Sequence, residues 1–415
     1  MRDTELYWHL LGLVAPWTVG DVTLSVEKRR VDVWVNHGAG LSWSCPQCAY
    51  HGSLHDHSDE RTWRHLDSCM FLTYLHARIP RVHCPEHGVL QVRVPWAEPH
   101  SRFTLLFERL AVEVLRHSHV KGAAEILRLS WDEVMLLMER AVARGQQRQQ
   151  PRALPTQLGI DEKYTSCGVL TLVNDLTHGC VAKVLPGKKK EPLRDYLSGF
   201  PQEQREQVSA VAIDMCDTFY AAVAATIPDA VDKIVYDRFH VMQHVSKAVN
   251  QVRSQESAQL ARNGDERLKG SRFVWLYSSE NVPAEQLEWL EQLKADKLQT
   301  GRAWALKELL RTLWQCTDRA QAKAVFYKWY GWSIRSRLEP IKAVAQRLRS
   351  RLSNILTYLE HRITNACSEG LNGAISTLIR RAYGYRNLRN LTTVIYFYLG
   401  GLSMDPALST HAVPG

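Results

Sequence analysis

Two aspartates stand where their carboxylates could share divalent cations. Asp161 follows the apolar run at residues 157–160, and Asp214 follows the run at 211–213, so each acid is expected at the end of a strand. A carboxylate that closes a buried strand loses hydration, which costs free energy unless something compensates the charge. If the two strands lie side by side, the carboxylates repel each other, and a divalent cation is the natural counter-charge. Two Mg²⁺ (or Mn²⁺) ions about 3.5–4 Å apart are what two-metal phosphoryl transfer requires.

A third ligand for such a site should come from a helix packed against the sheet. Glu369 is the best candidate, because it is a lone acid at the expected start of a helix. Asp237 and His240 close the next strand, where His240 could contact a phosphate or position a metal-bound water with Asp237 in support. Each residue also has an ordinary explanation. The strand-end aspartates could be turn residues, the helix dipole favours an acid at the place of Glu369, and Asp237 with His240 could be a structural polar pair.

Four cysteine and histidine residues form two close pairs. Cys45-Pro-Gln-Cys48 is followed, 36 positions after Cys48, by Cys84-Pro-Glu-His87. Zinc takes four such ligands at tetrahedral corners, and a C-x-x-C turn supplies two of them. The pattern predicts a structural Zn²⁺ site with no open position, and the alternative is two unrelated turns with free cysteines. The spacing favours His87 as the fourth ligand, although His83 also flanks Cys84.

The other cysteines carry no such pattern. They are scattered through apolar surroundings, which is typical of reduced, buried thiols in a cytosolic protein. Cys69 lies near the two pairs in sequence, and we expect it to be a core residue and not a ligand.

The elements that must position these residues fall into four segments, namely residues 1–100, a segment of helical spacing at 103–144, a linker at 145–155 and a long α/β region after it. Residues 1–100 are rich in Trp, His and Cys and contain short alternating runs that predict strands. Residues 145–155 form a polar linker punctuated by proline. Residues 240–361 are helical and basic without a clear strand, and a final helix is expected to begin near Glu369. Between the linker and the helical stretch, an antiparallel meander is predicted from three strand-like runs, at residues 157–164, 168–173 and 181–185.

Residues 120–142 predict two helices separated by a short break. Ser130 and Glu133 fit a capping box, in which Ser130 accepts from an amide of the second helix and Glu133 reaches back. A preceding helix at residues 103–115 would complete a three-helix DNA-binding unit with its last helix in a major groove. The alternative is an ordinary helical hairpin.

The charge of the chain favours a polyanionic partner. The net charge is +9 over 415 residues, and a surplus of cations attracts DNA through phosphate contacts and counterion release. No signal peptide or membrane span is expected, and we expect a cytoplasmic, nucleoid-associated protein. Sequence-independent contacts to the backbone of double-stranded DNA are expected from basic residues that could otherwise be solvated helix faces, namely Arg335, Arg337, Lys342, Arg347, Arg380, Arg381 and Arg386.

At these residues the chain resembles, from end to end, the transposases of the ISL3 family of bacterial insertion sequences. The resemblance is carried by Cys45-Pro-Gln-Cys48, Trp63-Arg64-His65-Leu66-Asp67, Arg81-Val82-His83-Cys84-Pro85, Gly159-Ile160-Asp161-Glu162, Ala212-Ile213-Asp214-Met215, Asp237-Arg238-Phe239-His240, residues 365–372, and Ala382-Tyr383-Gly384-Tyr385-Arg386-Asn387. It implies a zinc finger, a helix-turn-helix and a DDE catalytic domain whose triad is Asp161, Asp214 and Glu369. The gap of 155 positions between Asp214 and Glu369 suits a helical insertion before the glutamate.

The predicted fold is therefore a multidomain α+β protein. Its parts are a β-rich zinc-finger domain (residues 1–100), a helix-turn-helix domain (101–150), an RNase H-like α/β catalytic core (151–245 and 360–405) and an all-helical insertion (246–359).

The resemblance also implies an activity and partners. A DNA transposase of this kind binds the terminal inverted repeats of its element, hydrolyses a phosphodiester at the element ends, and transfers the freed 3′-hydroxyl to target DNA. Two ends must be brought together, so a homodimer or larger assembly is expected. Two alternatives are a zinc-dependent DNA-binding regulator with an inactive core, and an RNase H-like nuclease that cuts without joining.

Overall fold

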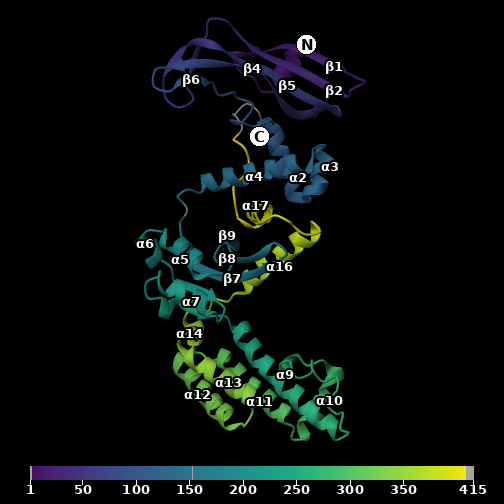
Figure 1. Ribbon diagram of the computed structural model, residues 1–415, viewed down its shortest axis with the longest axis vertical. Coiled ribbons are helices and arrows are strands. Elements are labelled where there is room, and N and C mark those ends of the chain that lie inside the picture. Colours follow the sequence, from purple (N-terminus) through teal and green to yellow (C-terminus); the bar gives the residue numbers. More distant parts are fainter. Residues whose placement is uncertain (1, 152, 408–415) are drawn as a thin grey trace. The chain divides into compact units, whose positions relative to one another are not determined.

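The computed structural model describes residues 2–151 and 153–407 (Figure 1). The chain divides into two compact units. The first holds residues up to 150 together with Tyr396–Tyr398 and the segment from Leu402 onward, and the second holds Pro151–Ile395 and Leu399–Gly401. Among the described residues, no helix combines the length and the apolar character needed to cross a membrane.

A six-stranded sheet forms most of the first unit. Its strand order is β1-β2-β5-β4-β3, with β6 paired to β5. The alternating run predicted as a strand buries Val31, Val33 and Val35 on one face of β2, while the residues between them are less buried. The elements are α1 (Asp3–Leu10), β1 (Trp17–Ser25), β2 (Arg30–His37), β3 (Ser42–Ser44), β4 (His51–Ser68), β5 (Phe71–Cys84) and β6 (Gly88–Gln91).

Three helices follow the sheet and pack against one another: α2 (Leu105–His117), α3 (Val120–Leu127) and α4 (Trp131–Arg148). The predicted capping box is confirmed. The Glu133 amide donates to Ser130 Oγ over 3.3 Å, and the Ser130 amide donates to the Glu133 carboxylate over 2.9 Å.

The linker predicted at residues 145–155 is partly wrong, because α4 continues to Arg148. Tertiary packing stabilises this last turn. Gly145 fits closely against Leu402 and Met404, and the buried Arg144 forms ion pairs with Glu98 and Glu108 while donating to the carbonyl of Met404. A polar sequence therefore remains helical where it is covered by a distant part of the chain.

Cys69 is not a core residue, contrary to the prediction. It lies exposed in the turn between β4 and β5 with a φ of 49°, because the two long strands carry this turn away from the core. The described cysteines form no disulfide bonds. Cys316 is buried as expected, whereas the scattered thiols of the second unit that are only half-buried are Cys167, Cys180, Cys216 and Cys367.

A five-stranded sheet of order β11-β10-β7-β8-β9 lies at the centre of the second unit. The predicted meander is confirmed, since β7, β8 and β9 pair antiparallel in sequence order. Strand β10 then pairs parallel to β7, and β11 pairs parallel to β10. The strands are β7 (Gln157–Thr165), β8 (Gly168–Asp175), β9 (Cys180–Pro186), β10 (Ala210–Ile213) and β11 (Ile234–Tyr236).

Parallel pairing requires crossover connections, and short helices supply them. These are α5 (Lys190–Ser198), α6 (Gln202–Glu206), α7 (Asp217–Ala224) and α8 (Ala230–Lys233).

Helices without a strand occupy the described residues 238–361, as predicted (Figure 1). Their core is rich in large aromatic side chains, with Trp275, Phe326 and Trp329 fully buried. The helices are α9 (Arg238–Arg262), η1 (Ser279–Asn281), α10 (Ala284–Ala295), α11 (Gln299–Arg311), η2 (Thr312–Gln315), α12 (Arg319–Arg335), α13 (Glu339–Ser350), α14 (Leu352–Leu356) and α15 (Tyr358–His361).

Two helices end the chain, where one was predicted. The helix expected near Glu369 is α16 (Ala366–Arg381), which begins three residues earlier, and α17 (Leu388–Leu399) follows it. The prediction missed α17 although Leu391, Val394 and Ile395 are buried at helical spacing.

Candidate active site and zinc centre

Asp161 and Asp214 lie on neighbouring strands at the same edge of the second unit's sheet. Ile160 of β7 pairs with Ile213 of β10, so the two aspartates are the next residues along parallel strands. Asp214 directly follows β10, as predicted. Asp161 is not at a strand end, because β7 continues to Thr165 through its pairing with β8. The two acids are nevertheless neighbours, as expected, because β10 ends at Ile213, beside Ile160 of β7, and each aspartate is the next residue.

The carboxyl of Asp161 is in an unfavourable place for a negative charge. Asp161 is only 7% exposed, and burial together with the charge of Asp214 raises its pKa to about 6. One oxygen accepts a hydrogen bond from the Glu162 amide over 2.7 Å, and the other accepts from Asn372 Nδ2. These two donors orient the side chain without supplying a positive charge.

Asp214 is in contact with the imidazole of His240. The His240 Nε2 atom lies 2.9 Å from Asp214 Oδ1. Oδ1 is buried, yet it accepts no well-aligned hydrogen bond from any described residue. Burial would lower the pKa of His240, but the contact with Asp214 outweighs it and the pKa is raised. The pair is therefore an imidazole that favours its protonated form beside a carboxylate with unused acceptor capacity.

Asp237 organises this corner through the backbone. As the N-cap of α9, it accepts from the amides of Phe239 and His240 over 2.5 and 3.4 Å. Its other oxygen accepts from the Asn365 amide over 2.7 Å, which ties the start of α16 to the start of α9. Asp237 thus fixes the helix turn that carries His240.

Glu369 lies in the first turn of α16 and is exposed. Partial burial and the charges of Asp237 and Asp214 raise its pKa, so the side chain lies within their electrostatic reach. Among the described residues, however, no three of Asp161, Asp214, His240 and Glu369 bring ligand atoms within 4.8 Å of one another. The structure places His240 in contact with Asp214 and places Asp161 on the adjoining strand, and it leaves Glu369 at the margin.

Two polar residues of this region were not singled out from the sequence. Asn372 lies three residues after Glu369 on α16 and donates to Asp161. Lys163, two residues after Asp161 on β7, donates to the carbonyl of Asn372 over 2.8 Å and to the Ser376 hydroxyl. The motif at residues 365–372 contains Asn372, but its partner lies 211 positions away, so no local pattern identifies the contact.

The four predicted zinc ligands converge in the first unit. Cys45 and Cys48 lie in the turn after β3, whereas Cys84 ends β5 and His87 lies in the turn before β6. Their ligand atoms all lie within 4.8 Å of one another, with Cys48 Sγ 3.6 Å from Cys84 Sγ and His87 Nδ1 3.5 Å from Cys84 Sγ. His83, the alternative, stacks on His55 instead.

The predicted basic contacts lie in the second unit. Arg347 donates to the carbonyl of Met215, the residue after Asp214, over 3.3 Å. Arg380 is close enough to Lys163 to lower its pKa together with burial, and Lys342 forms an ion pair with Glu339. The remaining members of the set are exposed, namely Arg335, Arg337, Arg381 and Arg386.

Comparison with known proteins matches three consecutive parts of the chain. The transposase model of the ISL3 family matches residues 158–395. The zinc finger of the transposases of IS204, IS1001, IS1096 and IS1165 matches residues 41–87, and the helix-turn-helix domain of the ISL3 transposase family matches residues 92–142.

Curated relatives match over most of their length. The transposase for insertion sequence element IS1557 of Mycobacterium tuberculosis is 26% identical over an alignment of 436 positions. The alignment covers 97% of this chain and 96% of the relative. The transposase for insertion sequence element IS1001 of Bordetella parapertussis is 27% identical over 361 residues, covering 86% and 87%. The resemblance found in the sequence is thereby confirmed, and the chain belongs to the ISL3 family of transposases.

Proposed function

We propose that this chain is the transposase of a bacterial insertion sequence and that Asp161, Asp214 and Glu369 are its catalytic acids. The observation that carries the proposal is the pair of aspartates on adjacent parallel strands, with the pKa of Asp161 raised by burial and by Asp214. Evolved sites tolerate such repulsion where function uses it, and divalent cations would relieve it. Three antiparallel strands followed by two parallel ones are compatible with the RNase H-like core that the family implies.

The donor set fits hard divalent cations. Carboxylate oxygens are the ligands that Mg²⁺ and Mn²⁺ prefer, and Asp214 Oδ1 is a buried oxygen with acceptor capacity to spare. Two such ions, when bound, would stabilise the attacking and leaving oxygens of a displacement at phosphorus.

The chain's own residues would hold and orient these groups. Asn372 and the Glu162 amide fix the rotation of the Asp161 carboxylate. His240, held by the Asp237 cap and with its pKa raised by Asp214, is placed to donate to a phosphate oxygen. Glu369, exposed in the first turn of α16, would complete the coordination of one ion by turning toward the aspartates when DNA is bound.

The first unit would recognise the terminal inverted repeats. Cys45, Cys48, Cys84 and His87 would hold a structural Zn²⁺ that ties the turn after β3 to the turn before β6. Helix α4 would enter the major groove. The helical stretch at residues 246–359 would be an insertion in the catalytic domain, and the basic residues of the second unit would contact the backbone of the terminal repeats and target DNA. Synapsis of two ends would require a homodimer or larger assembly.

A strand-transfer assay tests the proposal. The full chain is incubated with Mg²⁺, target DNA and a duplex carrying the inverted repeat that flanks the gene. Asp214→Asn removes a charge worth several kcal/mol of metal-assisted catalysis, so we expect joining to fall by about 10³-fold or more while DNA binding persists. Asp195→Asn, at an exposed aspartate of α5, is the matched control and should join normally.

The alternatives give different outcomes in the same assay. Cleavage without joining by the unaltered chain would indicate a nuclease and contradict the proposal. Binding without either reaction would indicate a regulator. Joining that survives Asp214→Asn would remove Asp214 from the catalytic site.

A further inference from the structure

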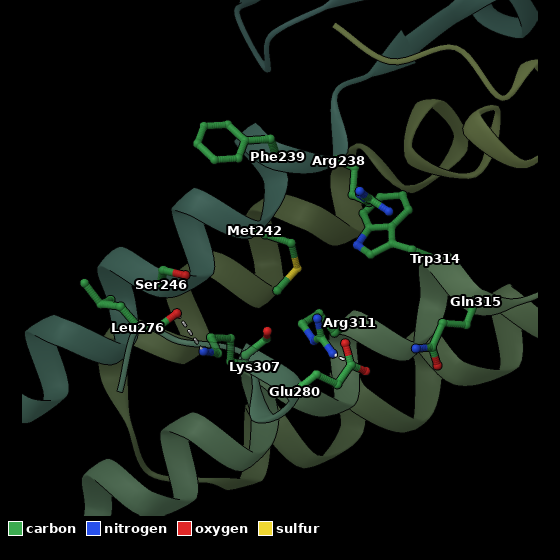
Figure 2. Close-up of a pocket in the computed structure, with 11 residues that line it drawn as sticks. Arg238, Phe239, Met242, Ser246, Leu276, Glu280, Lys307, Arg311, Trp314 and Gln315 are labelled. Atoms are coloured by element: carbon green, nitrogen blue, oxygen red, sulfur yellow. Dashed lines mark hydrogen bonds and ion pairs between the residues drawn. The ribbon is translucent and has the colours of Figure 1, made fainter. Parts of the chain in front are cut away.

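A pocket of about 460 Å³ lies in the helical part of the second unit, outside the carboxylate site (Figure 2). This volume is in the range of small-molecule sites, roughly 300–1,000 Å³. One wall is the first two turns of α9, including Arg238, Phe239 and Met242. The opposite wall is formed by α11 and η2, with Lys307, Arg311 and Trp314.

The pocket adjoins the candidate active site through α9. His240, which contacts Asp214, lies between Phe239 and Met242 in the same helix turn, and the rings of Phe239 and His240 meet edge to face at 5.6 Å. A strand of DNA with its phosphate beside His240 would thus reach the mouth of this pocket within about one nucleotide, since one helix turn spans about 5.4 Å.

The inner part of the pocket is polar at its edges but does not present free charge. Lys307 is buried, and its ammonium donates to the carbonyls of Trp275, Leu276 and Tyr277. Arg311 forms an ion pair with Glu280 over 2.9 Å. Lys307 also lies 3.4 Å from the carboxylate of Glu308, so both cations are neutralised and do not suit a phosphate.

Trp314 turns one edge of its indole, with an unused donor, toward the pocket (Figure 2). The residue is 7% exposed, and its Nε1 atom is buried without a hydrogen-bond partner among the described residues. In Figure 2 the indole nitrogen points toward Met242 and Arg311, into the space between the two walls. A buried N–H without a partner costs free energy, which a ligand acceptor would recover.

The mouth differs from the interior. Arg238 is exposed, forms no ion pair with a described residue and lines the pocket together with Trp314 (Figure 2). The Phe239 ring is 57% exposed. An aromatic ring and an unpaired cation at an entrance are the groups on which proteins stack a base and bind its phosphate.

We propose that this pocket holds an unpaired nucleobase of the DNA substrate, stacked on Phe239 at the mouth with an edge acceptor on Trp314 Nε1, and with the adjoining phosphate beside Arg238. The inference rests on the proposed function for DNA as the substrate. A base is the ligand that combines a flat face with donors and acceptors at its edge, as the neutralised interior requires. The pocket would keep one nucleotide out of the duplex next to the carboxylates.

An abasic scan of the flanking inverted repeat tests this pocket. Binding of the full chain is measured in Ca²⁺ to duplexes in which one nucleotide at a time lacks its base. We expect one position near the cleaved bond where loss of the base weakens binding by about 5- to 100-fold, the fold-change that corresponds to one stacked base. Trp314→Leu should weaken binding to the intact duplex and show a smaller further loss at that position, and Trp314→Phe, which also lacks the indole N–H, should behave in the same way.

Trp332→Leu is the matched control, because Trp332 is 52% exposed on α12 and does not line the pocket. It should bind every duplex as the unaltered chain does. If the loss of binding free energy at the abasic position and the loss in Trp314→Leu simply add, the proposal is overturned. A scan without any sensitive position would overturn it as well.

A crosslinking measurement needs no variant and so does not depend on the folding of Trp314→Leu. A photoreactive 5-iododeoxyuridine at the sensitive position should crosslink to peptides containing residues 238–246 or 311–315, and crosslinks confined to other peptides would overturn the proposal. Joining assays separate this inference from the proposed function. If the chain joins DNA but shows no sensitive position, the inference about the pocket fails and the proposed function stands. If it shows the sensitive position and the crosslink but never joins DNA, the proposed function fails and the inference about the pocket stands.

Discussion

The two candidate metal sites of this chain are assembled in opposite ways. In the first unit, Cys45, Cys48, Cys84 and His87 already lie within 4.8 Å of one another. They come from two tight turns that each contribute a pair three residues apart. In the second unit the acids come from β7, the end of β10 and the start of α16, and among the described residues no three of the site's side chains converge.

The difference extends to what surrounds the ligands. Thiols of the zinc cluster contact one another and His87. The carboxylates are held by other side chains, Asp161 by Asn372 and Asp214 by His240. A closed set of four ligands suits an ion that never leaves, whereas carboxylates with replaceable partners suit ions that must also bind substrate. If the proposed function holds, the chain therefore keeps its structural metal and its catalytic metals in separate units.

The largest expected effect comes from opening the closed site. Cys84→Ser removes a thiolate that both turns share, so the first unit should lose more than about 5 kcal/mol of stability, since structural zinc contributes about 10–16 kcal/mol in zinc-finger peptides. Zinc content and the melting temperature of the purified chain measure the loss. Binding to the inverted repeat should fall with them.

Cys69→Ser is the control for this experiment, because Cys69 is a free, exposed thiol of the same unit. It should keep both zinc and stability. Unchanged zinc content in Cys84→Ser would mean that the cluster is not a closed four-ligand site, and the contrast between the two sites would disappear.

A smaller effect is expected from relieving repulsion at the open site. The pKa of Asp161 is about 6 in the folded chain and 3.8 in the unfolded one. Below pH 4 both states carry the proton and nothing is lost. As pH rises through 6 the folded state must give up a proton that it binds more tightly, so stability falls by up to about 3 kcal/mol. Asp161→Asn should therefore stabilise the Mg²⁺-free chain at pH 7 and not at pH 4.

Calorimetric unfolding of Asp161→Asn and the unaltered chain, compared between pH 4 and 8 with zinc retained, measures this difference. Asp195→Asn should show no such pH dependence. A variant that is less stable than the unaltered chain at pH 7 would mean that the carboxylate is favourably paired without metal, as in a structural ion pair.

Local signals made part of this molecule predictable. The two ligands of each zinc pair lie three residues apart, the capping box spans Ser130 to Glu133, and the meander has turn residues between its strands. In each case the physical cause acts over a few neighbouring residues. The same is true of Asp214, which follows a short apolar strand.

Contacts between distant parts of the chain made the rest unpredictable. Helix α4 passes through a polar stretch because Gly145 packs against Leu402. Asp161 is inside a longer strand because β8 continues to pair with β7. Which polar residue orients Asp161 depends on how α16 lies on the sheet, and the sequence motif around Asn372 does not contain that information.

The smallest effect should come from that orienting residue. Asn372 donates to Asp161 and takes no other part in the proposed chemistry, so Asn372→Ala should leave folding and DNA binding intact while lowering joining and Mg²⁺ affinity by about 10- to 100-fold, as for other partners of metal ligands. Titration of joining against Mg²⁺ measures both quantities. Thr377→Ala, at an exposed position of the same helix, should behave normally. An equal Mg²⁺ requirement in Asn372→Ala and the unaltered chain would show that Asp161 needs no orientation. The open site would then resemble the closed one, with ligands that suffice by themselves.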